Sequence, residues 1–419
     1  MSILLYADDI ILLAENENDL QSMLEIVENW CRKWRLEINL NKTNVMHVRK
    51  KRKPQSRFCF LLNLQPVSYC QSYKYLGVYI NEFLDFNFSV SKQVDSAGRA
   101  LGSIITKMIK NEGLPFNVYS LLYEACVCSI SDYSAAVTGF GSNDLLEKLH
   151  LRALRAFLGV PKNTCNAAIT SEFNLLVPKY RTKISMIRFY HRLMKMEDDR
   201  LTKRIYMWDR SLNESDLISS WPNEVKNIFS EAGLSSTYDT NLSFNKSDII
   251  AIITNYFRAE QSRLMQQECQ GKPKMRTFLR FKSFDLEEAE YLSKPLSFFQ
   301  RRALARLRLG CLPLRIETGR FQIPRLPEEE RICEVCVPRP GVDSIENECH
   351  FLFQCVAYQT ERDIWYSRMV LPENFKELPL DNQLKVVLNE PLNLKHTANY
   401  VISAFNQRSK HVNCPITLG

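Results

Sequence analysis

The sequence lacks any long hydrophobic run. The apolar stretch that opens its 419 residues, Ile3 to Ala7, is interrupted by Asp8 and Asp9, whereas a helix that spans a bilayer needs roughly 18 or more apolar residues. No lysine or arginine precedes that stretch, which argues against a secretory signal peptide. We therefore expect no membrane partner and a location inside the cell, in the cytoplasm, the nucleus or both.

Disulfide bonds and repeats are not expected to organise the fold. The 13 cysteines are odd in number and scattered over a long chain, so we interpret them as free thiols plus at most one metal set. Hydrophobic residues at 45% and charged residues at 24% exclude a wholly disordered chain. The length predicts two or three domains, and the net charge of +8 permits a polyanionic partner.

The first fifty residues show the clearest local pattern. Two short apolar runs flank Asp8 and Asp9, which predicts a hairpin with both carboxylates at its tip. Apolar residues then recur at helical spacing up to Trp34, with Asn18 or Asp19 as the expected N-cap. Alternating apolar residues from 36 to 40 predict a further strand, and 45 to 48 a short one.

The rest of the chain is predicted to be mostly helical after a second small sheet. The aromatic-rich residues 58–62 and 73–80 favour strands. The predicted helices cover 90–109, 116–137, 145–158, 222–232 and 248–267. Ser142 or Asn143 is the expected N-cap of the third of these helices, and Gly159 its end.

The paired carboxylates suggest metal chemistry. A rigid hairpin tip carrying Asp8 and Asp9 suits Mg²⁺, which is usually bound by one or two carboxylates together with substrate phosphates. The corresponding reaction is two-metal phosphoryl or nucleotidyl transfer. The alternative is a solvated Asp-Asp turn, since aspartate is a good turn former.

Context favours the first interpretation. The motif Tyr6-Ala7-Asp8-Asp9-Ile10 is followed by a helix bearing Trp30, then by Leu36-Glu37-Ile38-Asn39-Leu40-Asn41-Lys42-Thr43, and then by Tyr75-Leu76-Gly77. In order, spacing and residue type this series resembles the reverse transcriptases of non-LTR retrotransposons. The chain departs from that family at residues 131–135, which read Ser-Asp-Tyr-Ser-Ala where the family usually has a proline-led segment ending in Tyr-Gly.

The resemblance implies a role for each motif. Asp8 would be a ligand of Mg²⁺ and Asp9 its supporting neighbour, while Lys42 would neutralise or protonate the leaving pyrophosphate. Tyr75, Leu76 and Gly77 would hold the primer end, and the partners would be an RNA template and a DNA primer or target. The alternatives are a surface lysine in a turn for Lys42 and an ordinary strand for residues 75–77.

The resemblance also implies parts that this chain does not show. A polymerase of this family needs a fingers subdomain and a palm strand with another metal-binding aspartate, both ahead of the Asp8 motif. The sequence begins at Met1. We therefore expect a C-terminal portion of the enzyme, inactive by itself, and the open alternatives are a truncated or decayed element, a gene model that starts late, or a retained fragment with a new role.

A second motif predicts a zinc site. Cys333, Cys336, His350 and Cys355 have the spacing of a closed tetrahedral Cys₃His set. Coincidence among 13 cysteines is the alternative interpretation, and Cys349 is a rival ligand. This segment also resembles the cysteine-histidine knuckle of non-LTR polyproteins, which is thought to contact nucleic acid.

Basic residues form two groups. Arg301, Arg302, Arg306 and Arg308 lie within about two helical turns and predict a phosphate-binding stripe, or else a solvated helix face. Residues 49–53, Arg-Lys-Lys-Arg-Lys, predict an exposed loop that serves as a nuclear-localisation patch or a template contact, or is simply disordered.

Together these patterns predict an α+β chain in which a partial polymerase palm with small antiparallel sheets precedes mostly helical segments. The expected parts are a partial palm with the primer-grip hairpin at 1–80, a helical thumb and linker at 81–210, a mixed helical connector at 211–325, a zinc knuckle at 326–365 and a helical tail at 366–419. The predicted function is that of a fragment of a Mg²⁺-dependent RNA-directed DNA polymerase. The alternative is a non-enzymatic RNA- or DNA-binding protein derived from a retrotransposon.

Overall fold

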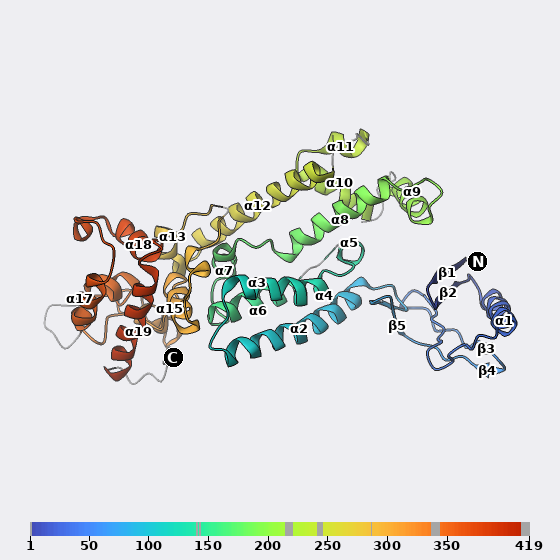
Figure 1. The fold of residues 1–419 in the computed structure, drawn as a ribbon, viewed down its shortest axis with the longest axis horizontal. Coiled ribbons are helices and arrows are strands. Elements are labelled where there is room, and N and C mark those ends of the chain that lie inside the picture. Colours follow the sequence, from blue (N-terminus) through green and yellow to red (C-terminus); the bar gives the residue numbers. More distant parts are fainter. Residues whose placement is uncertain are drawn as a thin grey trace. The chain divides into compact units, whose positions relative to one another are not determined.

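The computed structural model describes residues 2–139, 141, 144–213, 221–240, 246–285, 287–336 and 344–411. Its contacts divide the chain into two units, Met1–Lys92 and Gln93–Gly419, each described here by itself (Figure 1). Helices dominate, and the strands of the described residues form three antiparallel two-stranded sheets. The predicted α+β class is thereby confirmed. No helix in the described ranges is long and apolar enough to cross a membrane.

All three sheets are hairpins of the first unit. They pair β1 (Ser2–Tyr6) with β2 (Asp9–Leu13), β3 (Leu61–Leu62) with β4 (Gln65–Pro66), and β5 (Ser72–Tyr75) with β6 (Val78–Asn81). The first hairpin has Asp8 in its turn and Asp9 as the first residue of β2, opposite Tyr6. The predicted hairpin with two carboxylates at its tip is confirmed.

The hairpin turns adopt left-handed backbone conformations. Leu76 has φ 45° and Gly77 has φ 85°, and positive φ at both central residues is what a type I′ two-residue turn requires. Ala7, in the turn of the first hairpin, has φ 53°. The left-handed region costs a residue with a Cβ about 1–2 kcal/mol of conformational free energy. The turns of both hairpins therefore hold a strained non-glycine residue, Ala7 in one and Leu76 in the other.

Helix α1 (Glu17–Trp34) begins ahead of its predicted cap. Its N-cap is Asn16, whose side chain accepts a hydrogen bond from the Asp19 backbone N–H at 2.9 Å. The predicted cap, Asn18 or Asp19, is therefore wrong. Leu24 of this helix packs into a small core with Val45 and the β3–β4 hairpin.

The strand predicted at residues 36–40 does not form. No strand pairs with this segment in the described part of the chain, and the Asn39 carbonyl accepts from the backbone N–H groups of Lys42 and Thr43, which makes a turn. The strand predicted at 45–48 is reduced to one isolated bridge between Val45 and Tyr69. Alternation of apolar and polar residues is not sufficient to predict a strand, because an extended segment becomes a strand only beside a partner.

The remaining elements are helices. The first group is α2 (Phe86–Lys110), α3 (Phe116–Leu122), a π-helical turn (Tyr123–Cys128), α4 (Ser129–Ser131), α5 (Ala135–Thr138), α6 (Asp144–Leu158), α7 (Asn166–Phe173), α8 (Pro178–Met194), α9 (Leu201–Asn213), α10 (Trp221–Glu231), α11 (Ser235–Thr240) and α12 (Lys246–Gln270). The second group is α13 (Phe278–Phe281), α14 (Glu290–Ser293), α15 (Phe298–Arg308), α16 (Arg315–Thr318), α17 (Gln359–Ser367), α18 (Leu380–Leu388) and α19 (Leu394–His411). Short 3₁₀ turns lie at Pro273–Met275, Gly319–Phe321, Val356–Tyr358 and Phe375–Glu377, and a π-helical turn at His350–Gln354.

Two of the helix predictions can be compared in detail. Helix α6 matches its predicted range, and Gly159 after it has φ 65°, as a left-handed C-cap requires. Its predicted caps, Ser142 and Asn143, lie outside the described residues. The single helix predicted over 116–137 is wrong, since the chain there contains a π-helical turn and a left-handed Ser134 with φ 58°.

Two hydrophobic cores support the second unit. The smaller one is formed by α8 to α12, which lie next to one another in Figure 1. Its buried residues include Tyr190, Phe229 and Phe257. The larger one continues from α2, α3 and α6 through α15 to α17–α19, and includes Leu304, Phe351 and Val401. Residues from the predicted connector, knuckle and tail therefore pack in one continuous core, while the five-part division itself stays a prediction.

Buried ion pairs connect distant segments of this unit. Glu172 of α7 and Arg308 of α15 form a two-pronged pair, with Nε–Oε2 2.7 Å and Nη2–Oε1 3.0 Å, and their side chains are 0% and 3% exposed. Burial favours the neutral carboxyl, yet the charge of Arg308 lowers the pKa of Glu172 overall. Glu346 and Arg408 of α19 form a second buried pair at 2.7 and 2.8 Å.

Candidate functional site

The hairpin tip presents its two carboxylates to solvent. Asp8 and Asp9 are both exposed, and the strands that hold them are fixed by five antiparallel residue pairs from Ser2↔Leu13 to Tyr6↔Asp9. The apolar strand residues are themselves exposed, with Leu5 67% exposed and Ile10 42% exposed. Within the described residues, no cluster of three or more Asp, Glu, His or Cys side chains includes either aspartate.

The other predicted catalytic residues lie at the surface of the same unit. Lys42 is exposed, and its carbonyl accepts a hydrogen bond from the Tyr73 hydroxyl at 3.2 Å. The turn bearing Lys42 is thereby attached to the β5–β6 hairpin, whose turn is Leu76-Gly77. No hydrogen bond or ion pair given for the described residues joins Lys42 to Asp8 or Asp9.

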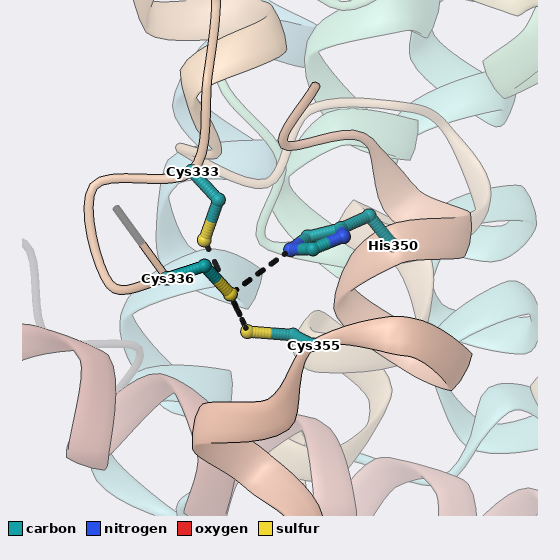
Figure 2. Close-up of side chains that lie close together, drawn as sticks. All are labelled: Cys333, Cys336, His350 and Cys355. Carbon is teal, nitrogen blue, oxygen red and sulfur yellow. Dashed lines mark hydrogen bonds between the residues drawn. The ribbon is translucent and has the colours of Figure 1, made fainter. Parts of the chain in front are cut away.

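The four predicted zinc ligands lie together in the second unit. Figure 2 shows the side chains of Cys333, Cys336, His350 and Cys355 pointing toward one another, and their ligand atoms all lie within 4.8 Å of each other. Cys333 Sγ is 3.9 Å from Cys355 Sγ, Cys336 Sγ is 3.5 Å from His350 Nε2, and Cys336 Sγ is 3.1 Å from Cys355 Sγ. All four residues are buried.

Local backbone structure positions these ligands. The Cys336 N–H donates to the Cys333 carbonyl at 3.1 Å, so the two thiols lie on one turn. His350 begins the π-helical turn, and the Cys355 N–H donates back to the His350 carbonyl at 2.8 Å. Arg362 of α17 then holds the Cys355 carbonyl at 2.7 Å. These contacts form the two halves of the cluster, and the bridge between Ile332 and Ile345 brings the halves together.

The geometry fits a tetrahedral metal. A Zn–S bond of about 2.3 Å implies S–S separations of about 3.8 Å, with slightly shorter S–N ones. The Cys333–Cys355 and Cys336–His350 distances agree with these values, and the Cys336–Cys355 pair is closer. Cys349 is not part of the cluster, and its Sγ instead lies 3.8 Å from Arg280 Nη1. A candidate Cys/His metal site is therefore present.

A residue that the sequence did not single out supports this cluster. Glu346 is 0% exposed, and its Oε1 lies 3.9 Å from Cys333 Sγ while Arg408 neutralises the carboxylate. Its other oxygen accepts from the Arg315 backbone N–H at 2.6 Å. No local pattern could reveal this role, because Arg408 lies 62 residues from Glu346 in the sequence.

The predicted arginine stripe requires correction. Arg301 and Arg308 are each only 2% exposed, so they cannot line a surface that binds phosphates. Arg301 Nε donates to the Phe157 carbonyl at 3.1 Å, and Arg308 pairs with Glu172. Arg302 and Arg306 remain partly exposed.

The basic run 49–53 is only partly a free loop. Arg49 Nη2 lies 2.9 Å from Glu82 Oε2, and both side chains are largely buried, at 12% and 8% exposed. Lys50, Lys51, Arg52 and Lys53 are exposed. The loop prediction is therefore right for the last four residues and wrong for the first.

Comparisons with known proteins show what this chain is similar to. Residues 1–80 match the family described as reverse transcriptase (RNA-dependent DNA polymerase). The chain is also similar to the "RNA-directed DNA polymerase from mobile element jockey" of Drosophila funebris, with 27% identity over 215 residues. That alignment covers 48% of this chain and 22% of the relative, so this chain spans only a fraction of the relative's length. No solved structure matches.

These matches confirm the predicted resemblance to non-LTR retrotransposon reverse transcriptases. Residues 1–80 are similar to a reverse transcriptase domain, and the relative is an RNA-directed DNA polymerase. Both matches are to polymerases, and neither is to a non-enzymatic binding protein.

Proposed function

We propose that this chain is a portion of the RNA-directed DNA polymerase of a non-LTR retrotransposon and that its first hairpin contributes to the catalytic site. The observation that carries this proposal is the exposed pair Asp8 and Asp9 at a hairpin tip, inside the segment that matches reverse transcriptases. In the whole enzyme, an RNA template and a DNA primer or target would be the substrates.

Each residue has a specific task in the proposed reaction. Asp8 would be a ligand of Mg²⁺, and Asp9, whose backbone pairs with Tyr6 in the ladder, would support the charge and position of the tip. The bound ions would stabilise the attacking and leaving oxygens of nucleotidyl transfer. Lys42 would place its ammonium group beside the leaving pyrophosphate and provide a proton there. The Tyr75-Leu76-Gly77 turn would hold the primer end, since glycine allows a close approach of backbones.

The cysteine-histidine cluster is proposed to hold a structural Zn²⁺. Four protein ligands, Cys333, Cys336, His350 and Cys355, complete a tetrahedral set and leave no position for a substrate. The ion would join the turn that bears Cys333 and Cys336 to the segment that leads into α17. The proposed parts of the chain are the palm portion 1–80, thumb and linker 81–210, connector 211–325, knuckle 326–365 and tail 366–419. The enzyme would work where its RNA and target DNA are found, inside the cell.

A chimera tests the catalytic proposal. Residues 1–80 replace the matching segment of the jockey polymerase, and template-directed primer extension is measured with Mg²⁺. We expect the chimera to extend primers and Asp8→Asn in it to abolish extension, because the tip then loses a charged ligand. Glu37→Gln removes an exposed carboxylate from the same segment and should leave extension unchanged.

Two results would overturn the proposal. One is a chimera that folds and binds template-primer but extends nothing. The other is extension that survives Asp8→Asn, since catalysis would then not depend on the hairpin tip.

A further inference from the structure

The outer face of α6 carries three cations in helical register. Lys148, Arg152 and Arg155 are spaced four and three residues apart, so they lie on one side of the helix. Lys148 and Arg152 are exposed, and Arg155 is partly exposed. In the described residues, none of the three has a carboxylate within ion-pair distance. Asp144 lies one turn before Lys148 but forms no ion pair with it, so in the described residues the three cations of this face have no carboxylate partner.

Two more uncompensated cations lie on α15, near the end of α6. Arg306 Nε donates to the Gly159 carbonyl at 3.0 Å, and a Cβ added at Gly159 would lie only 2.9 Å from Arg302 Cγ. Both arginines therefore pack against the residue that ends α6. Arg302 Nε is buried and has no partner in the described structure, and no described carboxylate pairs with either guanidinium.

These two groups of cations border the same connection, the loop from Gly159 to Cys165 between α6 and α7. Arg155 Nη2 donates to the Thr164 carbonyl at 3.3 Å, which attaches the α6 face to the end of that loop. Arg306 holds the beginning of the loop at Gly159. Lys162, at the centre of the loop, is exposed and adds another positive charge.

Burial without a counter-ion makes this arrangement costly. Burial lowers the pKa of Arg306, and the neighbouring charge of Arg302 lowers it further. Burial likewise lowers the pKa of Arg302. Binding of an anion stabilises a partly desolvated positive charge, because the anion replaces the lost hydration and offsets the repulsion between the two guanidinium groups.

We propose that Lys148, Arg152, Arg155, Arg302 and Arg306 form a basic surface around the α6–α7 loop that binds the phosphate backbone of a nucleic acid. The α6 residues alone extend over about 10 Å, at about 1.5 Å per residue. That length corresponds to several phosphates of one strand, which follow at about 3.4 Å along a duplex. A single small anion would occupy only one end of it.

The chemistry predicts how this surface recognises its ligand. Guanidinium and ammonium groups contact phosphates regardless of the base, so the surface should position a strand without reading its sequence. The choice of nucleic acid rather than another polyanion rests on the proposed function, since the relative is an RNA-directed DNA polymerase.

Binding of the full chain to fluorescein-labelled oligo(U) RNA, measured by anisotropy over a range of salt concentrations, tests the proposal. We expect Arg302→Gln/Arg306→Gln and Lys148→Gln/Arg152→Gln each to weaken binding severalfold. Each pair should also make the log–log salt slope shallower by about 1.4, at about 0.7 per lost phosphate contact on a single strand. The second pair is exposed on α6, so its result does not depend on packing around Gly159.

The matched control is Arg188→Gln/Arg192→Gln on α8, which removes two exposed arginines with the same four-residue spacing. It should leave both affinity and slope close to those of the unchanged chain. If the control weakens binding as much as the other pairs, the effect is one of net charge and the surface is refuted. If neither pair on the surface alters binding in folded protein, the proposal is also wrong. Failure of the chimera to extend primers, with this binding intact, would refute the proposed catalytic function alone.

Discussion

Acid sensitivity is predicted from one buried histidine. His150 of α6 is 1% exposed, its Nδ1 lies 2.7 Å from the Tyr123 hydroxyl, and its Nε2 has no partner among the described residues. Burial, aided by the charge of Arg181, lowers its pKa from 6.5 to about 3. His150 is therefore neutral in the folded protein at pH values well above 3.

The folded and unfolded pKa values of His150 determine how the stability of the protein changes with pH. Because the folded-state pKa is depressed, the unfolded chain takes up the proton first as the pH falls below about 6.5. The contribution of His150 is fully present above that pH and is lost progressively down to about pH 3. Each pH unit in this window changes the free energy of unfolding by about 1.4 kcal/mol, so the loss between about pH 7 and pH 5 is about 2 kcal/mol.

Urea denaturation of the full chain and of His150→Gln, followed by circular dichroism across this pH range, measures the effect. Glutamine does not titrate, so the free-energy difference between the two proteins should shrink by about 2 kcal/mol from about pH 7 to pH 5. A difference between the chain and His150→Gln that is independent of pH would refute the assignment of a neutral, desolvated His150.

Three other outcomes are expected. Cys336→Ser should lower bound zinc well below one equivalent, as metal analysis of the purified chain would show, and full zinc content would contradict the ligand set. Arg308→Met should lower the free energy of unfolding by about 3–5 kcal/mol because Glu172 stays buried without its partner, and denaturation should show less loss when Glu172→Gln is added; equal losses would argue against a charge effect. The chain alone should extend no primer with Mg²⁺ or Mn²⁺, since no described third carboxylate joins Asp8 and Asp9; template-directed incorporation that disappears in Asp8→Asn would disprove this.

Local patterns predicted the parts whose geometry is set by neighbouring residues. The Asp8–Asp9 hairpin follows from two apolar runs around a tight turn, and the Cys333 to Cys355 cluster follows from two short spacings that form turns. In both cases the contacts that form the turns join residues close together in the sequence. The roles of Asp8, Asp9 and Lys42 in catalysis came from the family resemblance and remain to be tested.

Long-range contacts explain what could not be predicted. Arg301 and Arg302 are adjacent in the sequence, yet one is buried against the Phe157 carbonyl, 144 residues away, and the other reaches the surface. Arg308 is buried in an ion pair with Glu172, which lies 136 residues away in the sequence. Periodicity could place these arginines on a helix but could not identify which side would meet a carboxylate from another segment.

The ion pair between Glu346 and Arg408 links the candidate metal site to α19, the last helix of the described chain. Arg408 neutralises the carboxylate that lies beside Cys333, and Tyr400 donates to the Phe351 carbonyl at 2.8 Å within the segment that carries His350. A premature stop codon ahead of Arg408 would leave every cysteine and histidine ligand in place. It would nevertheless leave the Glu346 carboxylate without its ion-pair partner beside Cys333. Such a nonsense allele should behave like the loss of a metal ligand, and residues 326–365 alone should not be transferable to another protein as a working module.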